Sequence, residues 1–315
     1  MSREPAADVQ VKVDVKELLQ EILKDVCVDE IDKEALELAR QYGYRPYMVQ
    51  RYIEILGYEE SEQLLKAFEN YTYRPAILCN KLKWDCNYLV KKLVELGFKV
   101  ERIPWHDYSF VIKGSPPKPS IGSTHEYLKG MYYVYRDPAS LLPVMVLKPK
   151  PETMVLDMCA APGGKAVHIL VEMGDRGLLI ANDIAIDRLE ALKANLFRMG
   201  FKSYVITAYD ATNLYNRLGI VFDYVLLDAP CSAEGAIMFD KSRKTKTTQK
   251  DLARLVLREI MLLLSAIKMV KPGGRIVYTT CSIAPEENEY VVNKVLELTN
   301  YNIDVEALNM DVGDR

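Results

Sequence analysis

The chain has 315 residues, which is long enough for two domains, and 49% of them are hydrophobic, an ordinary fraction for a globular protein. No apolar run approaches the ~20 residues that a membrane-spanning helix needs, and the acidic, polar N-terminus has no secretory signal. We therefore expect an intracellular, cytoplasmic protein that has no membrane partner. The net charge of −3 predicts no general attraction to nucleic acid.

Charged residues are distributed unevenly along the chain. Residues 1–70 contain 9 Lys and Arg against 16 Asp and Glu, whereas residues 71–150 contain 13 against 6. Because phosphate binding depends on local basic surface rather than on mean charge, the second segment could contact nucleic acid. The alternative is that the two segments are differently solvated surfaces, and charge alone does not separate these interpretations.

The first 70 residues are predicted to form a helical region. Apolar residues recur at helical spacing in residues 14–26 and 30–41. Two more helices are predicted at residues 47–56, directly after Pro46, and at residues 61–69. The aromatic side chains of this region are expected to pack within it rather than to stack on bases.

Residues 71–120 are predicted to form a small α+β module. Strands are expected at residues 76–79, 99–103 and near 110–112, with a helix at 85–96 and a Pro-rich linker at 114–119. The lysines of the module, with Lys81 and Lys83 among them, are expected to lie near one another.

Residues 121–315 are predicted to form the main domain, into which residues 130–142 lead. Strands are expected at 154–157, 178–182, 204–207, 223–227 and 275–280, and helices at 164–173, 185–198, 248–269 and 286–298. Right-handed βα units in this order build an open, doubly wound parallel sheet, so the predicted fold class is α/β. Residues 301–305 are a candidate sixth strand, and we find no candidate for a seventh.

A glycine-rich turn follows the first strand of this domain. Residues 153–165 change from an apolar run to small residues, including Gly163 and Gly164, before a helical pattern resumes. Such a turn binds nucleotide-like ligands, because glycines let the backbone approach and the helix N-terminus offers N–H groups. A triphosphate-binding loop would need Gly at Cys159, and a dinucleotide-binding loop would need Gly at Lys165. S-adenosylmethionine is therefore the best candidate among adenosine cofactors.

Acidic residues follow the other strands at the same edge of the predicted sheet. Asp183 follows the second strand and Asp210 the third, so that their carboxylates could accept hydrogen bonds from ribose hydroxyls and from the adenine amino group. Asp228 ends the fourth strand. The alternative is that each acid caps a helix N-terminus.

Two cysteines follow the fourth and fifth strands. Cys231 and Cys281 each precede a predicted helix, whose dipole favours a thiolate, the only form of cysteine that is a competent nucleophile. A methyl donor, an acid and two thiols at one site indicate a reaction at a carbon that is not nucleophilic by itself, such as carbon 5 of a pyrimidine.

The sequence indicates no metal site. The six cysteines are scattered without a C-x-x-C pair, so neither a zinc knuckle nor a disulfide framework is predicted. His106, His125 and His168 are too few and too dispersed for a metal site. Each histidine is expected to be a satisfied core or surface residue.

Three motifs resemble those of the RNA 5-methylcytosine methyltransferases that have two active-site cysteines, the Nop/Sun type, which includes archaeal tRNA methyltransferases. They are Cys159-Ala-Ala-Pro-Gly-Gly-Lys165, Asp228-Ala-Pro-Cys-Ser232 and Tyr278-Thr-Thr-Cys-Ser-Ile-Ala-Pro-Glu-Glu-Asn-Glu289. With weaker matches upstream, the resemblance covers most of residues 70–300. It implies a class I, Rossmann-like methyltransferase sheet and an RNA-binding role for the small module.

The resemblance also implies the roles of the site residues. S-adenosylmethionine would be held by Cys159, Ala160, Ala161, Pro162, Gly163, Gly164, Lys165, Asp183, Arg188, Asp210 and Asp228. Cys281 would attack carbon 6 of cytosine, Cys231 would help to remove the carbon 5 proton, and Asp228 would meet the N3 edge of the base. The residues alone leave open which cysteine attacks, because DNA-type enzymes use the one in a Pro-Cys motif.

The expected partner is RNA, single-stranded or remodelled, because the target base must leave its stack. We favour tRNA over rRNA, since no rRNA-specific extension is visible, and we assume a monomer. Residues 241–246 are expected to be a mobile basic loop that touches phosphates. Two alternatives are methylation of an exocyclic amine or a protein, which needs no thiol, and a non-catalytic RNA-binding or assembly factor that has kept the fold.

Overall fold

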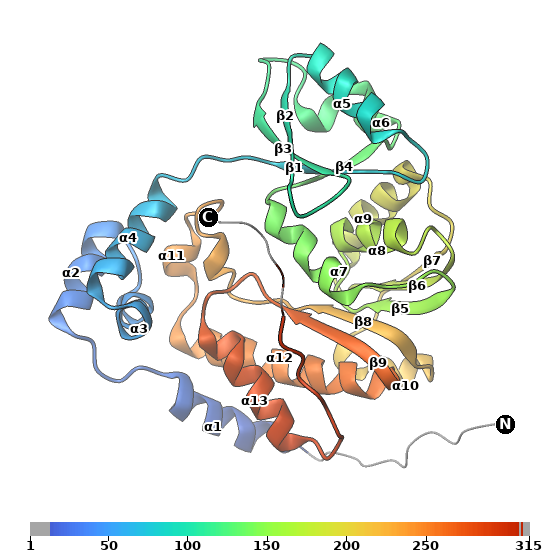
Figure 1. Ribbon diagram of the computed structural model, residues 1–315. Coiled ribbons are helices and arrows are strands. Elements are labelled where there is room, and N and C mark those ends of the chain that lie inside the picture. The colour runs from blue at the N-terminus through green and yellow to red at the C-terminus, as the bar shows by residue number, and fades with distance from the viewer. Residues whose placement is uncertain (1–12, 309, 311–315) are drawn as a thin grey trace. The chain divides into compact units, whose positions relative to one another are not determined.

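The computed structural model describes residues 13–308 and residue 310 (Figure 1). Contacts divide the chain into two compact units. The described residues of the sheet unit are 72–229, 265–279, 307–308 and 310, and those of the helical unit are 13–71, 230–264 and 280–306. These contacts divide the chain differently from the three consecutive regions that we predicted, because the N-terminal helices group with the segments that contain Cys231 and Cys281.

The sheet unit contains a five-stranded parallel sheet in the order β7-β6-β5-β8-β9. Its strands are β5 (Thr153–Asp157), β6 (Gly177–Asn182), β7 (Tyr204–Thr207), β8 (Phe222–Asp228) and β9 (Val270–Thr279). The order reverses beside β5, which is where ligands bind in sheets of this kind. The predicted doubly wound α/β fold is confirmed, and its first five predicted strands are present.

Helices of the sheet unit connect these strands. They are η2 (Pro138–Leu141), α7 (Leu142–Leu147), α8 (Gly164–Glu172), α9 (Ile186–Met199), η3 (Ala211–Asn213) and α10 (Leu214–Leu218), and α12 (Gln249–Met269) contributes residues to both units. Strands β5, β6 and β8 each contain consecutive buried residues, as is typical of parallel sheets with both faces covered.

A second sheet in the same unit is antiparallel, in the order β2-β3-β1-β4. It consists of β1 (Ala76–Cys79), β2 (Lys99–Arg102), β3 (Ser109–Gly114) and β4 (Tyr132–Tyr135), with α5 (Cys86–Glu95), η1 (Ile121–Ser123) and α6 (His125–Leu128) beside it in the chain. Strand β4 was not predicted. Its residues are Tyr-Tyr-Val-Tyr and largely buried, so they lack the alternation that marks a half-exposed strand.

The two sheets share one hydrophobic core with α8 and α9, which lie between them in Figure 1. The side-chain amide of Asn80 donates to the backbone oxygens of Met199 at 3.1 Å and of Gly130 at 3.3 Å. A Cβ atom on Gly130 would lie 2.1 Å from the backbone oxygen of Arg198, so only glycine fits there. The small module is therefore packed into the sheet unit as part of one body.

A disulfide joins Cys79 at the end of β1 to Cys86 at the start of α5. The sequence pattern predicted no disulfide framework, and it missed this bridge. The two residues are only 7 positions apart, and the turn between strand and helix brings them together, which their spacing did not indicate.

The helical unit begins with the four predicted N-terminal helices. Its helices are α1 (Val15–Val26), α2 (Lys33–Tyr42), α3 (Pro46–Leu56), α4 (Tyr58–Glu69), η4 (Glu234–Ala236), α11 (Arg243–Lys246), η5 (Pro285–Glu287) and α13 (Glu289–Leu298), with the first part of α12. Gln249 exchanges hydrogen bonds with both backbone groups of Val28. Among the described residues, no helix is both long and apolar enough to cross a membrane.

The predicted mobile loop at residues 241–246 is instead partly helical and attached to α4. Lys241 donates to the backbone oxygen of Phe68 at 2.7 Å and pairs with Glu69 at 3.2 Å. Lys244 also pairs with Glu69, at 2.5 Å. Part of the segment is therefore the helix α11 rather than a loop, and its contact with phosphates stays a prediction.

The candidate sixth strand at residues 301–305 is also wrong. These residues follow α13 and form no strand. Val305 is 67% exposed, and no strand pairs with this segment within residues 13–308. A strand needs a neighbour that accepts and donates its backbone hydrogen bonds.

Candidate active site

Cys231 and Cys281 lie together in the helical unit, as the sequence predicts. Their Sγ atoms are 3.2 Å apart, and the backbone N–H of Cys281 donates to the Sγ atom of Cys231 at 3.3 Å. The cysteines follow two neighbouring parallel strands, in which Asp228 of β8 pairs with Thr279 of β9. This register explains how residues 50 positions apart come to the same place. Cys281 is exposed and Cys231 is half-buried.

Serine and glutamate side chains connect the two cysteine loops. Ser232 follows Cys231, Ser282 follows Cys281, and the two serine Oγ atoms are 3.1 Å apart. The buried carboxylate of Glu287 accepts hydrogen bonds from the backbone N–H of Ser232 at 2.6 Å and from its hydroxyl. Since Glu287 comes from the segment after Cys281, this carboxylate fixes one loop against the other.

A buried arginine from the N-terminal helices supports the same two loops. Arg51 in α3 is 4% exposed. Its guanidinium pairs with Glu234, which follows the first loop, and donates to both carboxylate oxygens of Glu286, at 3.0 and 3.1 Å. Tyr52 also donates to Glu234, at 3.2 Å. Our sequence analysis missed Arg51, because its partners are 183 and 235 positions away.

The surroundings of Cys231 do not favour its thiolate. The hydrogen bond with Cys281 is the main cause that raises the pKa of Cys231, and burial is the second. The prediction that a helix dipole lowers this pKa is therefore wrong for Cys231, because the neighbouring thiol and desolvation outweigh the dipole.

The glycine loop lies in the sheet unit between β5 and α8. Gly163 has a left-handed backbone with φ +108°, and a Cβ atom there would lie 2.9 Å from the Cδ1 atom of Leu192. A Cβ atom on Gly164 would lie 2.9 Å from the ring of Tyr135. These glycines therefore let α8 pack closely against α9 and β4, a structural reason for them besides the predicted approach of a ligand.

The backbone of the loop is held by hydrogen bonds to both backbone and side-chain groups. Ala160 donates its N–H to the backbone oxygen of Asn182 at 2.7 Å, and Ala161 donates to the carboxylate of Asp183 at 3.0 Å. Asp183 also accepts from the backbone N–H of Ala185 at 2.9 Å, and the Arg188 guanidinium donates to the backbone oxygen of Ala161. The structure thus brings Asp183 and Arg188 to the predicted loop and shows that both help to shape it.

Asp228 and Asp210, the other two predicted acids, have different hydrogen-bond partners. Lys165 donates to the carboxylate of Asp228 at 2.6 Å, so the end of β8 is joined to the start of α8. Asp210 is exposed and accepts hydrogen bonds from the backbone N–H and the hydroxyl of Thr212. Asp210 thus caps η3, which is the alternative that the sequence left open for it.

Asp157, at the end of β5, is an acid of this region that our sequence analysis did not select. It is fully buried. Burial, and secondarily the charge of Asp228, raise the pKa of Asp157 to about 8. Asp157 is the last residue of the strand that precedes the glycine loop. This position could have identified it as a candidate site residue.

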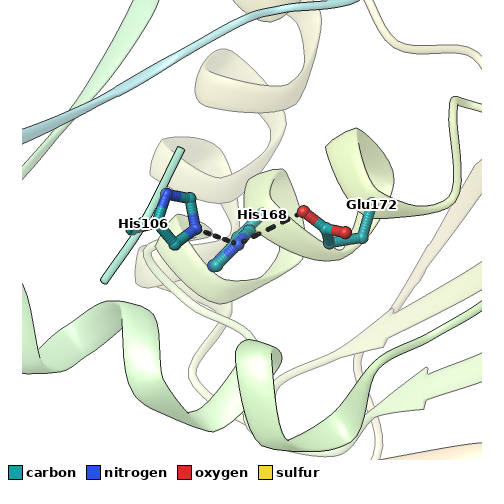
Figure 2. Close-up of side chains that lie close together, drawn as sticks. All are labelled: His106, His168 and Glu172. Atoms are coloured by element: carbon teal, nitrogen blue, oxygen red, sulfur yellow. Dashed lines mark hydrogen bonds and ion pairs between the residues drawn. The ribbon is translucent and has the colours of Figure 1, made fainter. Parts of the chain in front are cut away.

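His106 and His168 lie together in the sheet unit, although the sequence predicted dispersed histidines (Figure 2). Their Nε2 atoms are 3.2 Å apart, and the Nε2 atom of His168 is 3.8 Å from Glu172, one turn later on α8. Both rings are buried, and neither Nδ1 atom has a hydrogen-bond partner. The prediction that each is a satisfied residue is therefore wrong for this pair.

Comparison with protein families identifies relatives of the chain. The model described as 16S rRNA methyltransferase RsmB/F matches residues 144–313. The chain is 38% identical over 273 residues to the 28S rRNA (cytosine-C(5))-methyltransferase of Mus musculus, covering 85% of this chain and 34% of that protein. It is 33% identical over 238 residues to ribosomal RNA small subunit methyltransferase F of Vibrio parahaemolyticus, covering 75% and 50%. The chain thus spans a third to a half of these relatives.

Solved structures share the fold over most of the chain. The crystal structure of PH0851 has a TM-score of 0.79 at 31% identity and covers 87% of this chain and 61% of its own. A methyltransferase homolog protein from Pyrococcus horikoshii has a TM-score of 0.75 at 32% identity, covering 85% and 83%. These likenesses confirm the predicted class I methyltransferase fold and the resemblance on which it rested.

Proposed function

The chain belongs to the RsmB/F family of methyltransferases, and from this premise we propose that it transfers a methyl group from S-adenosylmethionine to carbon 5 of cytosine in RNA. The family is one of S-adenosylmethionine-dependent enzymes, which agrees with the enzyme class and the cofactor expected from the sequence. The observation that carries the proposal is the thiol pair, because its Sγ atoms lie 3.2 Å apart and both come from motifs that resemble those of cytosine-5 enzymes.

The residues around the glycine loop fit a cationic cofactor. The carboxyl groups of Asp183 and Asp228 lie near enough to Asp157 that their charges raise its pKa. A phosphate-bearing ligand would meet like charges here, whereas the sulfonium and ammonium groups of S-adenosylmethionine would be stabilised. When bound, this cofactor supplies an electrophilic methyl group. Asp183, Arg188 and the loop residues 159–165 would hold it.

The role that we assign to Cys281 is to make carbon 5 nucleophilic. Its thiolate forms a bond to carbon 6 of cytosine, and the electron pair of the C5–C6 double bond becomes available at carbon 5 to take the methyl group. Loss of the carbon 5 proton then re-forms the double bond and expels the Cys281 thiolate. Cys281 suits this role because it is the more exposed thiol of the pair.

The role that we assign to Cys231 is removal of the carbon 5 proton. Its hydrogen bond with Cys281 is the main cause of its raised pKa. Once Cys281 is bonded to the base, this cause is removed, so Cys231 can release its own proton to solvent and then accept the carbon 5 proton. Asp228 would contact the N3 edge of cytosine. For this contact, the Asp228 carboxylate must give up its hydrogen bond with Lys165.

Two RNAs are candidate substrates. The curated relatives are named as rRNA methyltransferases, which supports rRNA. The sequence led us to favour tRNA, and this preference stays a prediction. We also propose that the protein is a cytoplasmic monomer. One chain carries both thiols and the glycine loop, which supports the monomeric state. Light scattering with and without RNA tests the monomeric state.

Nucleotide-resolution bisulfite mapping of RNA, after incubation with the full chain and S-adenosylmethionine, tests the proposal. We expect new 5-methylcytosine in one class of RNA, and its position decides between tRNA and rRNA. Cys281→Ala is expected to abolish it, whereas Cys231→Ala is expected to accumulate a covalent RNA adduct. Cys27→Ala removes a thiol outside the pair and serves as the control. Methylation without either thiol, or no methylation by the wild-type chain, would contradict the proposal.

A further inference from the structure

We propose that His106, His168 and Glu172 form a binding site for a divalent transition-metal ion, with Zn²⁺ the best match (Figure 2). Each residue offers one ligand atom, and the three atoms lie within 4.8 Å of one another. None of the three belongs to the residues that we propose to hold the cofactor or the cytosine. The inference therefore stands apart from the proposed function and is tested by metal binding.

The geometry of the three ligands fits a tetrahedral ion. Imidazole nitrogens bound to Zn²⁺ at about 2.0–2.1 Å lie about 3.3 Å from each other at the tetrahedral angle. The Nε2 atoms of His106 and His168 are 3.2 Å apart. Glu172 follows His168 by four positions on α8, so both side chains project from one helix face. Its oxygen is 3.8 Å from the Nε2 atom of His168, and a small movement of this partly exposed carboxylate completes the set.

The Nε2 atoms of the two buried imidazoles face each other, so that one ion between them could bind both rings. Ligation through Nε2 places the proton on Nδ1, and no described group donates to either Nδ1 atom.

An ion could enter from solvent and keep one open position. A surface pocket of about 440 Å³ is lined by His106 and Glu172, together with Lys81, Trp105 and Tyr108. His168 closes the inner side, because its ring is fully buried. Three protein ligands with a fourth position toward a pocket resemble zinc sites that carry a water molecule.

Lys81 is the competitor of the ion. Its ammonium is 3.5 Å from the carboxylate of Glu172 and lies over the ring of Tyr108, 3.7 Å from the centroid. A bound cation must displace Lys81 from Glu172, since both require the same negative charge. Removal of the ammonium should therefore tighten binding, an effect in the opposite direction from the loss of a ligand.

The ion would connect two parts of the sheet unit. His106 lies in the connection between β2 and β3, whereas His168 and Glu172 lie on α8, the helix that follows the glycine loop. Because the ion would bind the folded site, its presence should stabilise the folded chain by mass action. We expect a higher temperature of unfolding with Zn²⁺ that depends on all three ligands.

Titration of the full chain with Co²⁺ and with Zn²⁺ tests the inference, in a Cys231→Ser, Cys281→Ser background because this thiol pair could also bind metal. We expect one ion per chain and visible Co²⁺ bands of tetrahedral type without a thiolate charge-transfer band. His106→Gln, His168→Gln and Glu172→Gln should each weaken binding by at least about tenfold. His125→Gln, which changes the remaining histidine, is the matched control and should bind as before.

Lys81→Met is the decisive variant. It should raise the affinity for the metal ion, whereas the ligand substitutions should lower it. If the buried His168 variant fails to fold, Glu172→Gln serves in its place, since this side chain is 31% exposed. The inference is overturned if the background chain binds no metal, if His125→Gln weakens binding as much as His106→Gln, or if Lys81→Met weakens it.

Discussion

The cysteine loops of the helical unit and the glycine loop of the sheet unit are held in different ways. The cysteine loops depend on buried charged groups, because Arg51 pairs with Glu234 and Glu286. The glycine loop depends on hydrogen bonds of its backbone, some of them with Asp183 and Arg188, and on the close contact of Gly163 with Leu192. Loss of one charge leaves its partner buried and unpaired, whereas the packed loop is disturbed by added volume. The two loops should therefore respond to different substitutions.

The largest effect is expected from Arg51→Ala. It leaves Glu234 buried without its cation, which typically costs about 3–5 kcal/mol of unfolding free energy. Urea unfolding measures this loss, and the thiol pair should also react differently with an alkylating agent because both loops lose their support. Arg254→Ala, which removes an exposed pair with Asp251, is the control and should change little. Equal effects of the two substitutions would show that Arg51 does not support the loops.

Gly163→Ala tests the packed loop. The left-handed backbone and the contact with Leu192 together predict a loss of about 2–4 kcal/mol. Gly219→Ala is the matched control, because Gly219 also has a positive φ but a Cβ atom there would meet nothing within 4 Å. The difference between the two variants, measured by urea unfolding, isolates the close contact. If they are equally destabilised, packing does not hold the loop.

Asp157→Asn should remove a pH dependence of stability. The pKa of Asp157 is raised from 3.8 to about 8 in the folded chain. Between these values the unfolded chain has lost the proton and the folded chain keeps it, so stability falls as pH rises, by up to about 1.4 kcal/mol per pH unit. Urea unfolding across this window should show a shallower decline in the variant. Parallel profiles for the two proteins would count against a buried, protonated Asp157.

The smallest effect on stability is expected from Glu69→Gln. Its pairs with Lys241 and Lys244 are partly exposed, so the loss should be below about 1 kcal/mol. The substitution frees two cations of the 241–246 segment, and filter binding should therefore show tighter RNA binding if that segment lies near phosphates. Unchanged RNA affinity would separate this segment from the RNA-binding surface.

Much of the glycine loop and its sheet could be predicted because the signals are local. A short apolar run, small residues and a helical pattern follow one another within residues 153–173. The meeting of Cys231 and Cys281 followed from the order of parallel strands, since the ends of neighbouring strands share one edge. In these cases a few consecutive residues carry the information.

The features that were missed are contacts between distant segments. Arg51 meets Glu234 across 183 positions, and His106 meets His168 across 62. Each residue alone is typical of a surface or core position, and only the packing of helices and sheets creates the pair. Strand β4 was missed for another reason, because its tyrosines are buried and show no alternation.

The bond between Cys79 and Cys86 has a practical consequence for work on this protein. Cys231 and Cys281 carry no disulfide, so a reductant that protects them in storage also threatens the Cys79–Cys86 bridge. The bridged turn contains Lys81. Samples prepared with and without dithiothreitol could then differ in metal affinity while having the same sequence, and assays should record the oxidation state of each preparation.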